Sequence, residues 1–367
     1  MRSSRRFRPR AALAPLIALA AALAIAVVPA TQAGAAGTGG PAGTDGAAAT
    51  AQVADLNGLT LTSVNNGRNL DVQNGNTGDG VFLVTNSAPG HHQEWSPVLR
   101  TDGSFTLVND ATGKCAAAGL PLRQQTCSGA AGQRWYFQPV SGAVDTYMVR
   151  NAGDHRCLDV VLAAQYDDAW TQTYGCNGSR AQQWRVPAWA SAAAFDAAVQ
   201  YAANRCQQDA STCSWRKGVQ EPAAPLPTEC VSPVWYNGTA AAVPWTFSLN
   251  TSSGWSSTLG VQFTSELGAG SPSPVQARVS LTISGSVTYD LREELGNSLT
   301  ISIPPGQYGW VELSALATRV TGEWTFDAAG YPWTAQDTVT VPLRNDDQGG
   351  ASVYLARAEA QFTGCGA

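Results

Sequence analysis

Hydrophobic and polar residues alternate along residues 275–291, in the C-terminal third of the chain. One set of alternate positions is mainly Val, Leu and Ile, and the other is Ser, Thr, Gln, Arg and Asp. A two-residue period is that of a β-strand with one buried face. Residues 255–267 alternate in a similar way, and a stretch rich in Gly, Ser and Pro at 268–274 separates the two segments. The pattern predicts an amphipathic β-hairpin.

Shorter runs of this kind predict further strands on both sides of a single helix. They lie at 105–108, 147–149, 298–303, 310–313, 318–326 and 338–343. Residues 191–206 instead place apolar side chains at helical spacing, with Ser191 as the expected N-cap. Charged residues make up only 13% of the chain and Gly occurs 37 times, which favours sheets joined by many turns. We therefore predict an all-β protein in which one short helix joins two domains.

The first 56 residues predict an export signal followed by a tether. A basic stretch ends at Arg10, an apolar run covers 11–28, and small residues follow, with a candidate cleavage site at 33–35. We predict a signal peptide at 1–35. A permanent membrane anchor is the alternative, which Pro15 and the high alanine content disfavour. Residues 36–56 are mostly Gly, Ala and Thr and predict a disordered linker.

Cysteine count and charge indicate the compartment and exclude one class of partner. All eight Cys lie beyond the predicted signal peptide, and an even number in an exported chain indicates disulfides in a secreted, extracellular protein. Five of the 22 basic residues precede the apolar run, so the rest of the chain carries 17 basic against 27 acidic residues. An acidic chain is a poor match for nucleic acid, and no nucleic-acid partner is expected.

Three segments within residues 57–187 end in the same motif, which is Gln, any residue, Trp. The motifs lie at 93–95, 133–135 and 182–184. They are 40 and 49 residues apart, which is the spacing of a repeated supersecondary unit. The repeats resemble the ricin B-type lectin family, whose three units form a β-trefoil. The resemblance implies a carbohydrate-binding domain at 57–187, with glycans or glycoconjugates as partners and the three Trp side chains in its core.

The third repeat carries the residues that the resemblance assigns to a sugar site. Asp159 and Tyr174 match the family's carboxylate and aromatic ring, and Gln172 matches its amide. Gln182 matches the residue that orients the carboxylate, while Ala181 stands where the family often has Asn. A carboxylate can bind two adjacent hydroxyls, and a flat ring covers the apolar C–H face of a pyranose. The resemblance implies galactose-type or related sugars.

The other two repeats retain less of this set. In the first repeat we predict a weaker second carbohydrate site formed by Asp71, His92 and Gln93, with Val84 at the position that we assign to the ring. His92 is either a hydrogen-bond donor to sugar or an ordinary surface-loop histidine. The second repeat has neither an acid nor a ring, since Gln125 takes the ring's place, and is expected to be structural. A trefoil without any active sugar site is the alternative.

The disulfide pairing follows the predicted domains. The resemblance implies two bonds within single repeats, and we expect one bond in the connector and one that joins the ends of the C-terminal domain. The pairs are Cys115 with Cys127, Cys157 with Cys176, Cys206 with Cys213, and Cys230 with Cys365. The connector, at 188–229, contains the helix and is rich in Cys and Pro. The C-terminal domain follows at 230–367.

The predicted hairpin, with the motifs at 304–310 and 320–324, resembles the aerolysin-type β-pore-forming module. This resemblance implies an elongated antiparallel β-sheet domain that acts at a membrane surface, forms homo-oligomers there and opens pores in glycan-bearing membranes. Transmembrane strands need about 9–11 residues, which the hairpin supplies. The alternative is a soluble carbohydrate-binding protein with a purely structural β-domain, because any half-exposed antiparallel sheet alternates in this way.

Catalysis has little support in the residues. The histidines are His91, His92 and His155, and none has the spacing of a metal ligand or of the base beside a nucleophile. Carboxylates for a glycosidase pair exist only as scattered acids, namely Glu266, Glu293, Glu294, Glu312 and Glu323. We predict that the protein is not an enzyme and has no metal or cofactor. An accessory role beside a glycoside hydrolase is the remaining alternative.

Overall fold

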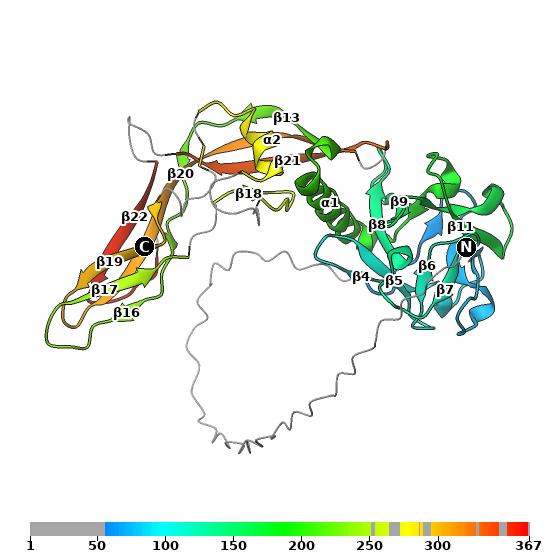
Figure 1. Cartoon of the computed structure of the whole chain (residues 1–367), viewed down its shortest axis with the longest axis horizontal. Coiled ribbons are helices and arrows are strands. Elements are labelled where there is room, and N and C mark those ends of the chain that lie inside the picture. Colours follow the sequence, from blue (N-terminus) through cyan, green and yellow to red (C-terminus); the bar gives the residue numbers. More distant parts are fainter. Residues whose placement is uncertain are drawn as a thin grey trace, which may run out of the picture. The chain divides into compact units, whose positions relative to one another are not determined.

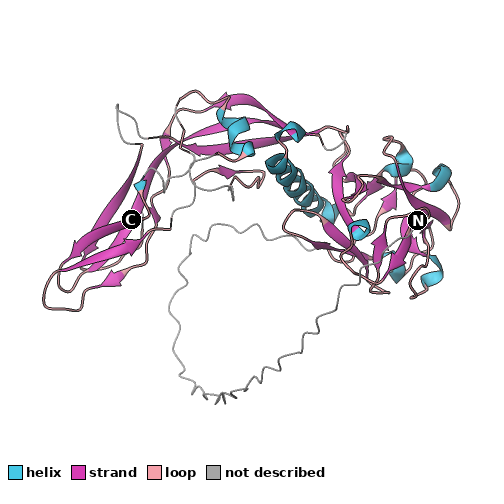
Figure 2. Cartoon of the chain, viewed as in Figure 1, coloured by secondary structure: helices cyan, strands magenta, loops and turns pink. Residues whose placement is uncertain are grey.

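The computed structural model describes residues 56–250, 254–263, 272–285, 287–288, 295–327, 330–344 and 351–365. The predicted signal peptide and all of the predicted linker except Leu56 lie outside these ranges, as do Glu266, Glu293 and Glu294. Strands and loops make up most of the described chain, with one long helix (Figure 2). The predicted all-β class, with a helix between two sheet domains, is confirmed. Within the described ranges, no helix is long and apolar enough to cross a bilayer.

The first domain consists of three four-stranded units that follow one another along the chain (Figure 1). The first unit contains β1 (Thr62–Ser63), β2 (Asn69–Val72), β3 (Leu83–Asn86) and β4 (Trp95–Leu99). The second contains β5 (Phe105–Asn109), β6 (Cys115–Ala117), β7 (Arg123–Gln125) and β8 (Arg134–Pro139). The third contains β9 (Thr146–Asn151), β10 (Cys157–Val160), β11 (Ala169–Tyr174) and β12 (Trp184–Arg185). Single 3-10 turns lie at Gln73–Gly75, His91–Gln93, Ala131–Gln133, Val161–Ala163 and Arg180–Gln182.

The outer strands of the three units pair into a closed ring of six. Antiparallel pairing runs in the order β1, β12, β9, β8, β5 and β4. A bridge between Leu59 and Trp95 joins the two ends. The inner strands form three hairpins, β2–β3, β6–β7 and β10–β11. Six barrel strands and three hairpins in repeated order form the β-trefoil that the three motifs predicted.

The last Trp of each repeat is part of the trefoil core. Trp95, Trp135 and Trp184 are at most 1% exposed. Each indole N–H donates a hydrogen bond to a backbone carbonyl of the first hairpin strand in its own repeat, because a buried Trp N–H needs a partner. The acceptors are Leu70, Ala116 and Leu158, each at 3.0 Å. The motif therefore ties every repeat to the core in the same way.

Helix α1 (Ser191–Gln208) follows the trefoil and confirms the predicted helix. It packs against β8, where Tyr201 stacks on Tyr136 with ring centroids 4.0 Å apart. Gly103 permits this contact, because a Cβ at that position would collide with the Tyr201 backbone. The predicted N-cap is wrong by one residue. Ser191 is already helical, and its hydroxyl donates to the Val144 carbonyl at 2.9 Å instead of capping the helix.

The second domain is organised along one long strand, β20 (Tyr308–Phe326), which contains both strands predicted at 310–313 and 318–326. Its first half pairs with β15 (Glu229–Cys230), β16 (Trp235–Tyr236) and β22 (Ser352–Glu359). Its second half pairs with β13 (Cys213–Gln220), β14 (Ala224–Pro225) and β21 (Trp333–Pro342), and β18 (Ser256–Ser257) adds to β21. Strand β17 (Val243–Ser248) pairs with β19 (Ser298–Ile303). This strand pair shares a small apolar core with the first half of β20, formed by Val231, Phe247, Leu249, Ile303, Val311 and Leu313.

The predicted amphipathic hairpin is wrong where the structure describes it. Residues Pro274–Ser280 form helix α2 rather than a strand. In the predicted partner strand, residues 254–263 contain only β18, and residues 264–271 lie outside the described residues. The hairpin that carried the resemblance to a pore-forming module is therefore not formed here.

A local capping box explains the helix. Ser273 Oγ accepts from the Gln276 N–H at 3.1 Å, and Gln276 Oε1 accepts from the Ser273 N–H at 2.9 Å. Pro274 occupies the first helical position, where its fixed φ and missing N–H are favourable. Val275 and Val279, four residues apart, are both buried. The helix start signal at 273–276 therefore outweighs the two-residue pattern.

All four predicted disulfides are present. Their Cα–Cα distances lie between 5.1 and 5.5 Å. The bonds are Cys115–Cys127, Cys157–Cys176, Cys206–Cys213 and Cys230–Cys365. Two of them close loops within single repeats of the trefoil, one links α1 to β13, and one joins β15 to the C-terminal segment.

Candidate functional site

The hairpin of β10 and β11 brings together three of the residues predicted to bind sugar. Its register sets Asp159 opposite Gln172 and Cys157 opposite Tyr174. Gln172 Nε2 donates to Asp159 Oδ1 at 2.8 Å. Alternate residues of a strand share a face, so Tyr174 lies on the same face as this pair. Asp159 is only 5% exposed, whereas the Tyr174 side chain is 54% exposed. A buried carboxylate held by an amide therefore shares a hairpin face with an accessible ring.

Gln182, the fourth predicted residue, holds the turn that follows the ring. Its Oε1 accepts from the Asn177 N–H at 2.7 Å, and its Nε2 donates to the Gly175 carbonyl at 3.0 Å. Gln133 makes equivalent contacts in the second repeat, which has no acid. Gln182 therefore restricts the loop beyond Tyr174, whichever ligand the site takes.

Burial raises the pKa of Asp159 above its ordinary value, because a desolvated carboxylate disfavours its charged form. Hydrogen bonding from Gln172 and then Gln182 partly offsets this rise. The carboxylate is poorly solvated, and hydrogen bonds to a charged group are stronger in such surroundings than in water. The site is therefore prepared to accept hydroxyl donors.

Two further positions lie close in sequence to this site. Ala181 is buried and belongs to the trefoil core, so the position next to Gln182 offers no polar group to a ligand. Asn177, which the sequence reasoning did not include, lies in the loop after Tyr174, and its Oδ1 accepts from the Ser179 N–H at 2.9 Å. In the sequence, the one feature that could have indicated Asn177 is its position directly after Cys176.

The first repeat holds the predicted second set of residues. Gln93 Nε2 donates to Asp71 Oδ2 at 2.7 Å, and Asn69 donates to Gln93 Oε1 at 3.0 Å. His92 Nε2 lies 3.9 Å from Asp71 Oδ1. Burial raises the pKa of Asp71, while Gln93 and His92 act in the opposite direction. Asp71, His92 and Gln93 are therefore close together, but Asp71 is buried.

The ring position predicted for the first repeat is corrected by the strand register. Val84 lies opposite Asp71, which is the place that Gln172 takes in the third repeat. The place of Tyr174 is taken by Asn86, which pairs with Asn69. The residue opposite the Asp lies 13 positions after it in both repeats, so the sequence reasoning, made without the register, counted two residues short of the ring position. Neither residue is aromatic, so this hairpin has no counterpart of Tyr174 at the corresponding position.

The second repeat presents no carboxylate on its hairpin. Ala117 lies opposite Arg123, and Cys115 lies opposite Gln125. Gln125 therefore occupies the place of the ring, as the sequence predicted. This hairpin has the same strand pairing and a disulfide, but it has no counterpart of the Asp159–Gln172 pair of the third repeat.

Two of the acids considered for a glycosidase pair, Glu312 and Glu323, have structural partners. Glu312 is buried, accepts from the Trp310 indole at 2.8 Å and pairs with Arg357 at 3.1 Å. Glu323 pairs with Arg216 at 2.7 Å. Both carboxylates are thus engaged within the sheet, which weighs against a catalytic pair made of these two.

The fold and the hairpin site define a three-repeat β-trefoil with a polar and aromatic surface site. Residues 58–184 match the family described as the ricin-type beta-trefoil lectin domain. This match supports a ricin B-type lectin domain in the N-terminal half of the described chain. No curated protein matches the chain.

Solved structures with similarity to the chain include proteins of different kinds. A designed threefold-symmetric protein, ThreeFoil, is 29% identical, with a TM-score of 0.33 and coverage of 35% of this chain and 96% of that one. The C-half of an earthworm R-type lectin, solved with GalNAc, is 17% identical, with a TM-score of 0.30 and coverage of 35% and 97%. An exo-β-1,3-galactanase from Clostridium thermocellum is 23% identical, with a TM-score of 0.34 and coverage of 36% and 30%.

Proposed function

We propose that the protein is a secreted lectin that binds galactose-type or related sugars through one active site, in the third repeat. The single observation that carries the proposal is the hydrogen-bonded pair of Asp159 and Gln172 on the same hairpin face as the exposed Tyr174. The ricin-type match at 58–184 supports carbohydrate as the ligand class. The four disulfides support export, because such bonds persist in oxidising compartments.

The chemistry of the site fits a pyranose. The Asp159 carboxylate accepts hydrogen bonds from two neighbouring sugar hydroxyls, while Gln172 keeps one of its oxygens in place. The Tyr174 ring covers the apolar C–H face of the sugar, and its exposure leaves that face open to solvent in the free protein. The Cys157–Cys176 bond and Gln182 limit the movement of the loop beyond the ring. Little ordering is therefore left for the ligand to impose.

A glycan array tests the proposal with a matched pair of variants. The wild type and Asp71→Ala are expected to bind the same terminal galactose or N-acetylgalactosamine structures, and Asp159→Ala is expected to lose them. Asp71 is the matched control because it is also a buried hairpin carboxylate paired with a glutamine. Equal binding by all three proteins would show that the site assignment is wrong. Loss on Asp71→Ala alone would move the site to the first repeat.

Pore formation is a second candidate function, and it would require helix α2 to convert to a strand. Helix α2 has only seven residues, so few backbone hydrogen bonds oppose its conversion to a strand, and the alternation along 275–291 favours that strand. Dye release from glycolipid vesicles, together with a heat-resistant oligomer, is the result expected of a pore former. A monomer that causes no release would leave a soluble lectin with a structural C-terminal domain.

A further inference from the structure

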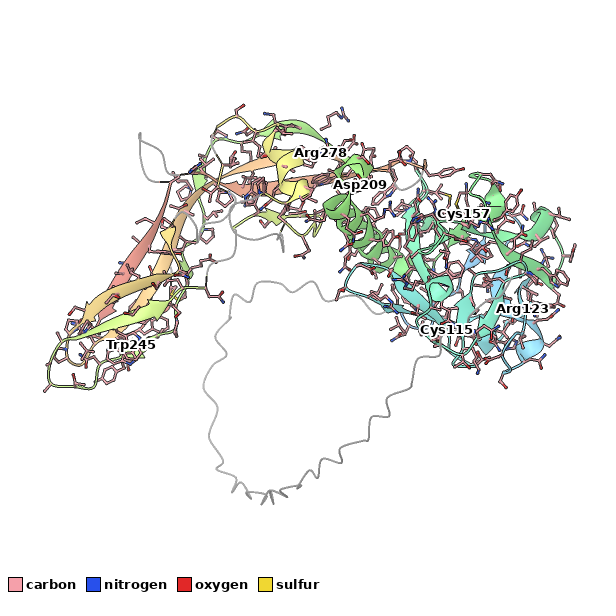
Figure 3. The ribbon with its side chains drawn as sticks, viewed as in Figure 1. Cys115, Arg123, Cys157, Asp209, Trp245 and Arg278 are labelled. Carbon is pink, nitrogen blue, oxygen red and sulfur yellow. A yellow bond between two sulfur atoms is a disulfide. The ribbon has the colours of Figure 1, made fainter. Side chains whose placement is uncertain are left out.

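His155 lies where helix α1 packs on the trefoil, with two arginines beside it. It is half-buried and belongs to the loop between β9 and β10, two positions before Cys157. Arg150 of β9 is 2% exposed and donates from Nε and Nη2 to the His155 carbonyl, at 3.0 and 2.7 Å. Arg205 of α1 places Nη1 at 3.3 Å from His155 Nε2. Figure 3 labels Cys157 in the trefoil and Asp209 at the end of α1, the two segments that this contact joins.

The contact with Arg205 determines which ring nitrogen of His155 carries a proton. A guanidinium group has only donors, so Nε2 must accept from it and cannot itself be protonated. Nδ1 lies 3.4 Å from the Tyr136 hydroxyl oxygen, where Nδ1–H can donate to it. Both ring nitrogens are therefore used by a neutral imidazole that has its proton on Nδ1.

A second proton on this ring would disrupt the arrangement. It would turn Nε2 into a donor that faces the donor of Arg205, and it would add a positive charge next to two guanidinium groups. Burial lowers the pKa of His155 below its ordinary value of 6.5, and Arg205 and Arg150 act in the same direction. Asp154 acts in the opposite direction, but it is exposed and lies 3.8 Å from Arg156.

The titratable and charged side chains around this ring come from β8, β9, α1 and the loop itself. They are Tyr136, Arg150, Tyr201, Arg205, Asp154 and Arg156, with Asp102, Asp209 and Tyr331 close to members of this set. Burial raises the pKa of Tyr136 and of Tyr201, so both phenols stay neutral in acid. Histidine is the residue type whose ordinary pKa places its charge change between pH 5 and 8. His155 is therefore the group that responds to mild acid at this contact.

We propose that His155 is an acid-sensitive contact between the trefoil and α1, and that its protonation releases the C-terminal end of the helix from the trefoil. Arg205 is directly followed by Cys206, whose disulfide to Cys213 joins the helix to β13 of the second domain. One turn of α1 thus carries both the contact with the trefoil and the covalent link to the second domain. A charge on His155 acts at the point where the chain passes from one domain to the other.

The direction of the pH effect follows from proton linkage. In the released state His155 regains a pKa near its ordinary value of 6.5, whereas in the packed state its pKa is lower. As the pH falls below 6.5, the released state takes up the proton first, so the contact is lost progressively until the pH reaches the packed-state pKa. Within this window the opening constant of the helix end rises by at most about ten-fold per pH unit, because one proton is involved.

Native-state hydrogen exchange at the amides of 201–206 measures this opening, in the full chain without its predicted signal peptide. After correction for intrinsic exchange rates, the opening constant of the wild type is expected to rise about three- to eight-fold from pH 7 to pH 5.5. His155→Asn should abolish the rise, because Asn is neutral at every pH and tolerates the φ of 59° at this position. His91→Asn is the matched control. It removes another histidine, in the turn His91–Gln93 of the first repeat, and should respond to pH like the wild type.

An NMR titration of the three histidine rings gives a readout that needs no substitution at His155. The ring of His155 is expected to titrate below pH 6.5 in the wild type and closer to 6.5 in Arg205→Gln, which removes one of the two cations. A wild-type ring that titrates at or above 6.5 would overturn the proposal. It would equally fail if the opening constant of the wild type were independent of pH, or if the rise persisted in His155→Asn. Loss of the rise in His91→Asn would place the acid-sensitive group in the first repeat instead.

Discussion

The Asp159→Asn substitution removes the charge from the third-repeat site while keeping the shape of the side chain. Asn Oδ1 can still accept the hydrogen bond that Gln172 Nε2 donates at 2.8 Å to Asp159. The two backbone contacts through which Gln182 holds the turn, to Asn177 and Gly175, do not involve Asp159. The variant therefore isolates the contribution of the negative charge to sugar binding from its contribution to the fold.

The expected magnitude follows from the burial and the partner of this carboxylate. A hydrogen bond to a charged group contributes about 1.5–3 kcal/mol, compared with roughly 1 kcal/mol for a neutral one. If two sugar hydroxyls donate to Asp159, losing the charge should weaken binding by about 2–3 kcal/mol, or roughly 30- to 150-fold. Folding should respond in the opposite direction. Burial raises the pKa of Asp159, so its charge opposes folding at neutral pH, and the variant should be at least as stable as the wild type.

Isothermal titration calorimetry with galactose and N-acetylgalactosamine measures the affinity, and urea unfolding measures the stability. Asp71→Asn is the matched control, because it removes another buried carboxylate whose pKa is raised, and its affinity should equal that of the wild type. Unchanged affinity of Asp159→Asn would refute the assignment of the carboxylate. A clear loss of stability in the same variant would refute the reasoning about its burial.

Three further predictions concern the same domain. Tyr174→Ala should weaken sugar binding about ten-fold and leave the urea midpoint unchanged, because the ring is largely exposed. Trp184→Ala should lower the free energy of unfolding by about 3–5 kcal/mol in the same urea experiment, since it removes a buried indole and its 3.0 Å bond to Leu158. The pH dependence of binding tests Asp159. Because the pKa of Asp159 is raised in the folded protein, half of the sugar affinity should be lost at a pH above 3.8, the ordinary pKa of the group. As the pH falls from the raised pKa to 3.8, protonation of this carboxyl should increase the free energy of unfolding. Half-loss of affinity at or below pH 3.8 would contradict this reasoning.

Features that depend on short stretches of sequence were predicted well. The spacing of the three closing motifs indicated the trefoil, and residues 191–206 indicated α1. The paired Cys residues also agreed with the structure in all four bonds. Most of these signals are local or repeated, so they survive without knowledge of which strands pair; the exception is Cys230–Cys365, which spans 135 residues and was expected because the two Cys bracket the C-terminal domain. The failure at 275–280 has the same basis, because the capping box of Ser273 and Gln276 is a local signal that the longer alternating pattern concealed.

The candidate site was predictable in its residue types but not in its contacts. The sequence named Asp159, Gln172, Tyr174 and Gln182, and the strand register then set Gln172 directly against the carboxylate. In the first repeat the register also moved the ring position from Val84 to Asn86. The spacing between paired residues is the same in the first and third repeats, so the error came from counting positions without the register, and a slip of two residues changes which side chain stands at the ring position.

By itself, the sequence indicated the three-repeat trefoil, the helix that follows it, the pairing of the cysteines and the residue types of the candidate site. Only the tertiary structure decided that β20 runs through both halves of the second domain, that α2 replaces a predicted strand, and that Trp235 of β16 and Trp245 of β17 stack on each other. The physical reason is distance along the chain. Periodicity, caps and motif spacing act between near neighbours, whereas burial and side-chain contacts depend on strands paired from residues far apart in sequence.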